Sequence, residues 1–345
     1  MTDSPTKQLR FLVIKLGGLD EFVQATGAFK AIHERHKDHH LTLLTTEPYV
    51  EWARRSGYFN RVWEDSLTPP WNVRHYLAFL RALREERFSG VYDLQCSRRT
   101  EWYFRLMGKK KPDWSGHISW CSHPHMPLEW ERLHLLDRQA GQLAEAGIPN
   151  LPPLDVSFIT ADISGYVLPP RYALLFPAGA PYQMPPRVMT AEGREIALPT
   201  RWSDVGFVEV ARWLERQEIT PVFIGSPDEK QLVDEVEGLC AGIKVVNLAG
   251  KVGFGEIAEL ARRAVVTIGN DTEPMWLVAA TGCKTVFAFP GFSDYKLRVP
   301  RGRDVRVIAE NDLAMLPARE VIRLAGELLA LDTSAESAKQ TVAVG

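Results

Sequence analysis

The sequence has little or none of several features that mark specialised classes of protein. Its 345 residues include only four cysteines, which lie far apart and form no Cys-x-x-Cys pair. This pattern suits reduced thiols in the cytoplasm rather than a disulfide framework. No run of 18 apolar residues is present, and no apolar signal segment precedes the first strand-like stretch. The formal charge of −2 disfavours nucleic-acid binding through bulk charge. We therefore expect a cytoplasmic protein with no nucleic-acid partner.

Histidine is absent from the second half of the chain. All nine histidines lie within the first 134 residues, so any chemistry of the second half proceeds without imidazole. His117, Cys121, His123 and His125 lie close together but match no standard zinc spacing, which favours an ordered loop over a metal site. No Gly-x-Gly-x-x-Gly follows any strand-like run, so an oxidoreductase that binds a dinucleotide has little support.

Apolar runs of strand length alternate with stretches of helical period throughout the chain. Runs that are apolar throughout are typical of strands buried on both faces, hence of parallel sheets covered by helices. Pro-rich breaks near residues 150–171 separate two such series, while residues 178–202 read as a long loop. We predict two doubly wound Rossmann-like α/β domains. The expected boundaries are residues 1–168, residues 169–331 and a disordered tail over residues 332–345.

Two strand-to-helix turns carry polar groups suited to chemistry. In the first, Gly17 and Gly18 allow a tight turn, and Asp20 and Glu21 follow at the start of a helix. These carboxylates could cap the helix or supply a general base. The second turn, residues 269–276, offers capping residues and a proline suited to the first helical turn. The exposed N–H groups of such a turn, at the carboxyl edge of a parallel sheet, suit a diphosphate.

Five segments in series resemble glycosyltransferase family 9, the ADP-heptose:lipopolysaccharide heptosyltransferase family. The resemblance covers roughly residues 10–330 and rests on short motifs in the family's order. These motifs lie at residues 14–25, 92–100, 223–229, 247–251 and 269–272. The resemblance implies a GT-B fold, with the acceptor site in the first domain and the nucleotide-sugar site in the second. It also implies inversion at the anomeric carbon without a metal. The lack of any Asp-x-Asp, the usual metal-nucleotide clamp of many sugar transferases, is consistent with this.

The resemblance also implies roles for particular residues. The catalytic positions are Glu21, where the family has its aspartate base, and the neighbouring Asp20. Expected acceptor-binding residues are Gly17, Gly18, Gln24, Arg98 and Arg99. Expected donor-binding residues are Gly179, Arg201, Glu229, Val252, Asp271, Thr272, Glu273 and Trp276, with Glu229 at the ribose, Val252 near adenine, and Asp271 and Thr272 at the sugar and diphosphate.

Three motifs depart from the family pattern. The family's Gly-Asp pair is replaced by Asp20-Glu21. Its Lys-x-Trp-Pro motif corresponds to residues 200–203, where the lysine is missing and Arg201 stands in the second place. Its Asp-Thr-Gly-x-x-His motif ends here in Trp276 instead of histidine. An arginine on the long loop (Arg187, Arg194 or Arg201) could replace the missing lysine, because a guanidinium binds phosphate well. Two readings follow. The chain is a transferase that moves a heptose-like sugar from an ADP-linked donor to a lipopolysaccharide-core or other cell-surface glycan, or it is a degenerate relative that binds or regulates. Peripheral contact with the inner membrane would involve the acceptor lipid and residues 109–111.

Overall fold

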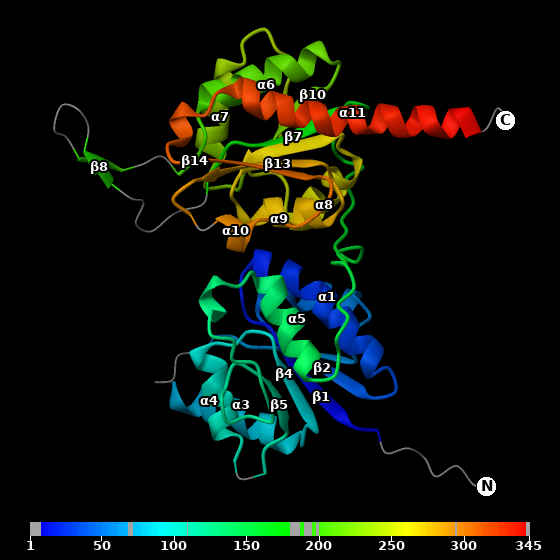
Figure 1. Ribbon diagram of the computed structural model, residues 1–345, viewed down its shortest axis with the longest axis vertical. Helices are drawn as coiled ribbons and strands as arrows, with labels where there is room; N and C mark the ends of the chain where they lie inside the picture. The colour runs from blue at the N-terminus through cyan, green and yellow to red at the C-terminus, as the bar shows by residue number, and fades with distance from the viewer. Residues whose placement is uncertain are drawn as a thin grey trace. The chain divides into compact units, whose positions relative to one another are not determined.

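The computed structural model describes residues 8–67, 72–108, 110–179, 187–189, 195–197, 200–293 and 295–342. The chain divides into two compact units, Met1–Phe158 and Ile159–Gly345. Each unit is built around a six-stranded parallel sheet with helices packed against it (Figure 1). The predicted pair of doubly wound α/β domains is therefore confirmed.

The first unit has the strand order β3-β2-β1-β4-β5-β6. Its strands are β1 (Arg10–Ile14), β2 (His40–Thr45), β3 (Arg61–Glu64), β4 (Gly90–Asp93), β5 (Asp113–Gly116) and β6 (His123–Pro124). Its α-helices are α1 (Leu19–Arg35), α2 (Val50–Arg55), α3 (Val73–Glu85), α4 (Arg98–Leu106) and α5 (Leu135–Glu145), with 3-10 turns η1 (Glu47–Tyr49) and η2 (Trp130–Arg132).

Alternate residues of β1 enter different faces of the first sheet, because successive side chains of a strand point in opposite directions. Leu12 and Ile14 join a core cluster with Trp114 of β5 and Tyr103 of α4. Val13, equally buried, lies between them and faces the other way. Helices α1 and α5 pack against each other (Figure 1), so the helix that carries Glu21 is a neighbour of the last helix of the first unit.

The second unit has the strand order β11-β10-β7-β12-β13-β14. Its sheet strands are β7 (Tyr172–Phe176), β10 (Thr220–Phe223), β11 (Val246–Asn247), β12 (Val266–Asn270), β13 (Thr285–Pro290) and β14 (Val305–Glu310). Its helices are α6 (Asp204–Arg216), α7 (Lys230–Leu239), α8 (Phe254–Arg263), α9 (Glu273–Ala280), α10 (Tyr295–Arg298) and α11 (Ala318–Val342), with the 3-10 turn η3 (Leu313–Met315).

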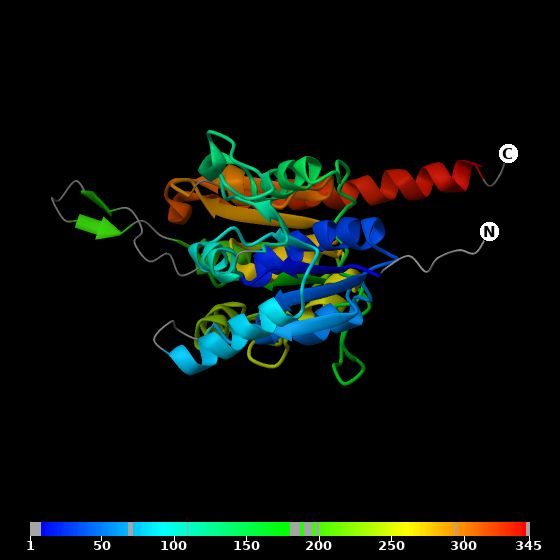
Figure 2. The same ribbon diagram turned by 90° about the horizontal axis from the view of Figure 1, so that it is seen from below.

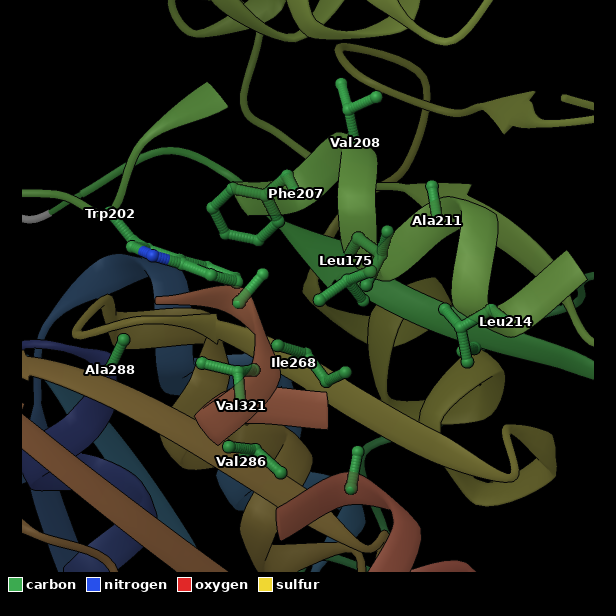
Figure 3. Packing of buried hydrophobic residues seen from close by; sticks show 14 of the residues in the cluster. Leu175, Trp202, Phe207, Val208, Ala211, Leu214, Ile268, Val286, Ala288 and Val321 are labelled. Carbon is green, nitrogen blue, oxygen red and sulfur yellow. The ribbon is translucent and has the colours of Figure 1, made fainter. Parts of the chain in front are cut away.

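Two apolar clusters sandwich the second sheet. One lies under α6, α7 and α11 and includes Leu175, Trp202 and Phe207, whose packing is shown in Figure 3. The other lies under α8 and α9 and includes Leu174 and Phe176 on the opposite face of β7. The indole of Trp202 is fully buried and its Nε1 donates to the carbonyl of Leu316, 2.8 Å away. The loop before α6 is thereby fixed to the core.

Three segments differ in detail from the sequence expectation. The units divide at 158/159 rather than 168/169, because Ile163 belongs to the second unit's core and Tyr166 and Leu168 pack against it. Inside the expected loop, β8 (Arg187–Met189) and β9 (Glu195–Ala197) pair as antiparallel strands. Helix α11 packs through Val321 and Leu328 and continues as helix to Val342, over most of the expected tail (Figures 1 and 2).

Both sheets reverse their winding direction beside their first strand. The switch point lies between β1 and β4 in the first unit and between β7 and β12 in the second. In open α/β sheets, ligands bind beyond the carboxyl ends of the strands at such points. Both turns that stand out in the sequence, residues 15–21 and 269–276, leave the sheet at these two positions.

Candidate active site

Glu21 folds back over the turn that follows β1. Gly18 is the N-cap of α1, and Glu21 is the third residue of the helix. Its Oε2 accepts hydrogen bonds from Lys15 Nζ at 2.5 Å and from Gln95 Nε2 at 3.3 Å. Any side chain at Gly17 would place its Cβ 2.0 Å from Glu21 Oε2. Glycine at position 17 is therefore what admits the carboxylate to this place.

Lys15 is a buried ammonium group at the end of an apolar strand. Its side chain is 1% exposed, whereas that of Glu21 is 37% exposed. Besides Glu21, its Nζ lies 3.5 Å from the carbonyl oxygen of Leu94. A buried charge is tolerated where it is paired and hydrogen-bonded, so Glu21 is the natural counter-ion of Lys15. The pair holds one carboxylate oxygen in place and leaves the residue open to a ligand on its exposed side.

Asp93 organises the neighbouring turn after β4. It is buried, and its Oδ1 accepts from the backbone N–H groups of Gln95 and Cys96 at 3.1 and 3.0 Å. Burial raises the pKa of Asp93 to about 6, against the pull of these hydrogen bonds and of the positive charge of Lys15. The turn also places the Gln95 Oε1 at 2.8 Å from the backbone N–H of Leu16, so Gln95 ties the two strand ends together.

A pocket of about 100 Å³ opens beside this ion pair. It is lined on the sheet side by Lys15, Glu21, Gln95 and Cys96, and on the α5 side by Arg138 and Gln139. The Arg138 guanidinium lies over the Trp130 ring and donates to the carbonyl of Leu133 at 2.9 Å. Desolvation lowers the pKa of Arg138 from its ordinary value. Of the residues that line the pocket, only Glu21 has a role predicted from the sequence.

The predicted acceptor residues divide into two groups. Gly17 and Gly18 lie in the turn beside Glu21, and Arg98 is exposed at the first position of α4. Gln24 is buried within α1 and donates to the carbonyl of Asp20. Arg99 forms a two-point ion pair with buried Asp65, with contacts of 2.8 and 3.1 Å. Its guanidinium is therefore already engaged in the protein.

In the second unit, Asn270 at the end of β12 joins three segments. Its Nδ2 donates to the carbonyls of Pro177 and Ala178 at 2.9 and 3.1 Å, and its Oδ1 accepts from the backbone N–H of Trp202 at 2.7 Å. The side chain is fully buried. This clamp brings the end of β7, the loop before α6 and the β12–α9 turn to one place. Asn270 lies within the motif at residues 269–272 but has no role predicted from the sequence.

The turn after Asn270 has the form expected of a helix start. Asp271 is buried, and Thr272 is the N-cap of α9 in an extended conformation. Among the described residues, the buried Oγ1 of Thr272 has no hydrogen-bond partner. Glu273 is exposed at the first helical position, whereas Trp276, in the place of the family's histidine, is buried. The exchange of histidine for tryptophan therefore fills core volume.

Gly179 and Arg201 lie against each other at the end of β7. A Cβ at position 179 would stand 2.7 Å from Arg201 Cβ. The Arg201 guanidinium pairs with Asp204, with an Nη1 to Oδ1 distance of 2.5 Å, and both side chains are about one-third exposed. Arg201 is thus beside the predicted donor site. To bind a phosphate, its guanidinium must either contact Asp204 and the phosphate together or break the ion pair with Asp204.

The two expected nucleoside contacts lie on the β10 side of the second sheet. Glu229 is the N-cap of α7, and its Oε2 accepts from the backbone N–H of Ser226 at 2.7 Å. Val252 packs partly buried against the core cluster beneath α8. Glu229 follows β10, which pairs with β7, whereas Val252 follows β11, which pairs with β10.

The described residues hold no group of three or more histidine, cysteine or acidic side chains that could bind a metal. Two histidines of the segment 117–125 have other partners. The His117 ring stacks on the Trp130 ring with their centroids 4.1 Å apart, and His125 Nδ1 lies 2.9 Å from Glu145 Oε1. Lys109, Arg194 and the side chain of Arg187 lie outside the described part of the chain. Nowhere in that part is there a helix long and apolar enough to span a bilayer.

Comparison with known proteins connects these features to one family. Residues 198–314 match the model of glycosyltransferase family 9 (heptosyltransferase). Lipopolysaccharide heptosyltransferase 3 of Escherichia coli is 23% identical over 294 residues, which cover 77% of this chain and 82% of the relative. The relationship to glycosyltransferase family 9 is confirmed. The chain is thus a glycosyltransferase that resembles family 9.

Solved structures of family 9 glycosyltransferases share the fold. A family 9 glycosyl transferase from Veillonella parvula superposes with a TM-score of 0.76 at 17% identity, covering 93% of this chain and 97% of its own. The ADP-heptose lipopolysaccharide heptosyltransferase II of E. coli gives a TM-score of 0.70 at 16% identity, covering 94% and 100%. The predicted GT-B fold is therefore confirmed.

Proposed function

We propose that this family 9 glycosyltransferase moves a heptose-like sugar from an ADP-linked donor to a lipopolysaccharide-core or other cell-surface glycan, with inversion and without a metal. The observation that carries the proposal is the Glu21 carboxylate, held through Oε2 by Lys15 and Gln95 at the edge of a pocket. A general base needs such a fixed position within reach of the hydroxyl that it deprotonates. The E. coli relatives named above, which carry heptosyltransferase in their names, support the donor class.

In this mechanism Glu21 takes the proton of the acceptor hydroxyl. Both of its hydrogen bonds from described residues go to Oε2, so we assign Oε1 as the atom that accepts the proton. The hydroxyl oxygen attacks the anomeric carbon as the bond to the nucleoside diphosphate breaks, and a single displacement inverts the configuration. Lys15 keeps the carboxylate in place during this step, because a base that swings away loses the benefit of orientation.

The second unit would receive the nucleoside diphosphate. The N–H groups at the start of α9 follow the Asn270 clamp, and Thr272 Oγ1 is a buried hydroxyl that a ligand could engage. We assign Arg201 to the diphosphate, where it would replace the family's lysine. Glu229 and Val252 would hold the ribose and the adenine. The exposed position of Glu273 lets its charge point to water rather than to the phosphates.

Calorimetric titration with ADP and ADP-heptose tests the donor assignment. We expect both to bind, and Arg201→Ala to weaken binding about tenfold, as loss of a charged hydrogen bond would. Arg303→Ala serves as the control, because Arg303 is also a surface arginine with an acidic neighbour. Failure of ADP and ADP-heptose to bind would refute the donor class, and tighter binding of a uridine or guanosine diphosphate sugar would replace it.

We further propose that the first unit approaches the inner face of the membrane through α4 and the loop after it. Trp102 and Trp120 are each about half exposed, and the Arg105 guanidinium lies over both rings. The Lys111 ammonium group also lies over the Trp120 ring, 5.3 Å from its centroid. Tryptophan with adjacent cations suits the interface of an anionic membrane. Sedimentation with phosphatidylglycerol vesicles should fall for Trp102→Ser, and equal sedimentation would refute the contact.

A further inference from the structure

Gln139 and Gln142 lie on the same side of α5 but differ in their hydrogen bonds. Both side chains are 1% exposed. Gln142 Nε2 donates to the carbonyls of Asp93 and Ser115, each at 3.0 Å, and its Oε1 lies 3.6 Å from the Cys96 thiol. Neither Nε2 nor Oε1 of Gln139 has a hydrogen-bond partner among the described residues. Both glutamines line the pocket beside Glu21.

A buried amide without partners is unfavourable, because folding removes its hydrogen bonds to water and provides no others in their place. Most buried polar side chains in proteins are hydrogen-bonded, so an exception beside a pocket calls for an explanation. A methionine or leucine would fill the same space without this cost. The placement of Gln139 against the pocket that contains Glu21 indicates that the missing partner is a group that enters this pocket.

The chemistry of the amide narrows the class of partner. A glutamine amide offers two donors on Nε2 and two acceptor positions on Oε1 in a single plane. A pair of adjacent sugar hydroxyls can match it, one accepting from Nε2 and the other donating to Oε1. A phosphate or carboxylate can only accept and would leave Oε1 unsatisfied. A hydrocarbon chain would leave both atoms unsatisfied.

We propose that Gln139 is a specificity-determining residue that hydrogen-bonds two neighbouring hydroxyl groups of the acceptor sugar. The inference rests on the proposed function, since it takes the pocket at Glu21 as the acceptor site. The hydroxyl that Glu21 deprotonates and the pair that Gln139 contacts belong to the same sugar. Gln139 thereby decides which hydroxyl of that sugar meets the base.

The test compares Gln139→Met with Gln142→Met in the full chain. Transfer is measured from ADP-heptose to de-O-acylated E. coli lipopolysaccharide, together with ADP affinity and the thermal midpoint of each protein. We expect Gln139→Met to lower kcat/KM for the acceptor about tenfold or more, the size expected for two lost hydrogen bonds. Its ADP affinity should stay that of the wild type, and its thermal midpoint should stay level or rise. Gln142→Met should lower the thermal midpoint, because it breaks hydrogen bonds that the structure shows.

A second measurement needs no turnover. The de-O-acylated lipopolysaccharide should raise the thermal midpoint of the wild type and raise that of Gln139→Met less, because a ligand at a given concentration stabilises a protein more when it binds more tightly. Acceptor kinetics of Gln139→Met equal to those of the wild type would overturn the inference while leaving the proposed function intact. A lowered midpoint with acceptor kinetics no worse than those of Gln142→Met would assign Gln139 a structural role and also overturn it. A wild type that binds ADP-heptose but neither binds nor glycosylates this acceptor would refute the proposed acceptor and the inference together.

Discussion

The two units share one strand order but place different kinds of group at their switch points. In the first unit, the switch point holds a carboxylate and an ammonium paired side chain to side chain, Glu21 with Lys15. In the second, Asn270, a neutral amide, bonds three backbone groups. A base must present a titratable side chain, whereas a diphosphate site needs N–H groups held in fixed directions. Under the proposed function, the same topology would serve proton transfer in the first unit and anion binding in the second.

Replacement of the proposed base, Glu21, should give the largest effect. Glu21→Gln keeps the shape of the side chain but cannot accept a proton, so we expect kcat to fall by about 10²- to 10⁴-fold. ADP affinity should not change, because ADP is assigned to the second unit. Glu34→Gln, which removes an exposed carboxylate at the other end of α1, is the matched control and should retain activity. Normal turnover by Glu21→Gln would remove the functional difference between the two switch points.

Asn270→Ala tests the switch point of the second unit. It removes three hydrogen bonds of a fully buried side chain and leaves two carbonyls and one N–H without partners. We expect a loss of about 2–4 kcal/mol in the free energy of unfolding and at least tenfold weaker ADP binding. Asn60→Ala removes one side-chain bond, to the N–H of Leu41 in the first unit, and should leave ADP binding unchanged. Denaturant unfolding and calorimetry measure both effects, and unaltered ADP binding by Asn270→Ala would contradict the proposed clamp.

Lys15→Met tests whether Lys15 holds the Glu21 carboxylate in position as well as balancing its charge. The free energy of unfolding should fall by about 1–3 kcal/mol, less than for a fully buried pair because Glu21 is partly exposed. The activity should fall as well, since Glu21 loses its strongest contact. The double variant Lys15→Met/Glu21→Gln should recover part of the stability but none of the activity. Additive stability losses would show that the two side chains do not depend on each other.

The sequence predicted the architecture better than the detail of the site. Apolar runs and helical periods are local signals, so two parallel α/β domains and both strand-to-helix turns could be recognised. Lys15 could not be assigned from sequence, because a lysine after an apolar strand usually reaches water, and only the fold shows that Gly17 turns Glu21 back onto it. Arg99 was assigned to the acceptor by its motif, yet its partner Asp65 lies 34 residues away. Contacts at such separations depend on the sheet order, which residue patterns alone do not give.

The smallest expected effect concerns Asp93, whose hydrogen bonds hold the turn that carries Gln95. Because burial raises its pKa to about 6, the folded protein favours the protonated form, and the contribution of Asp93 to stability falls as the pH rises from about 4 to 6. Asp93→Asn carries no charge, and its Oδ1 can still accept from the N–H groups of Gln95 and Cys96. We expect this variant to be about 1–2 kcal/mol more stable than the wild type at pH 7 and to lose that advantage below pH 4. Unfolding curves at pH 4, 5, 6 and 7 measure the difference. An advantage that is equal at all four values would mean that the charge of Asp93 is compensated, and that Lys15 serves two carboxylates rather than Glu21 alone.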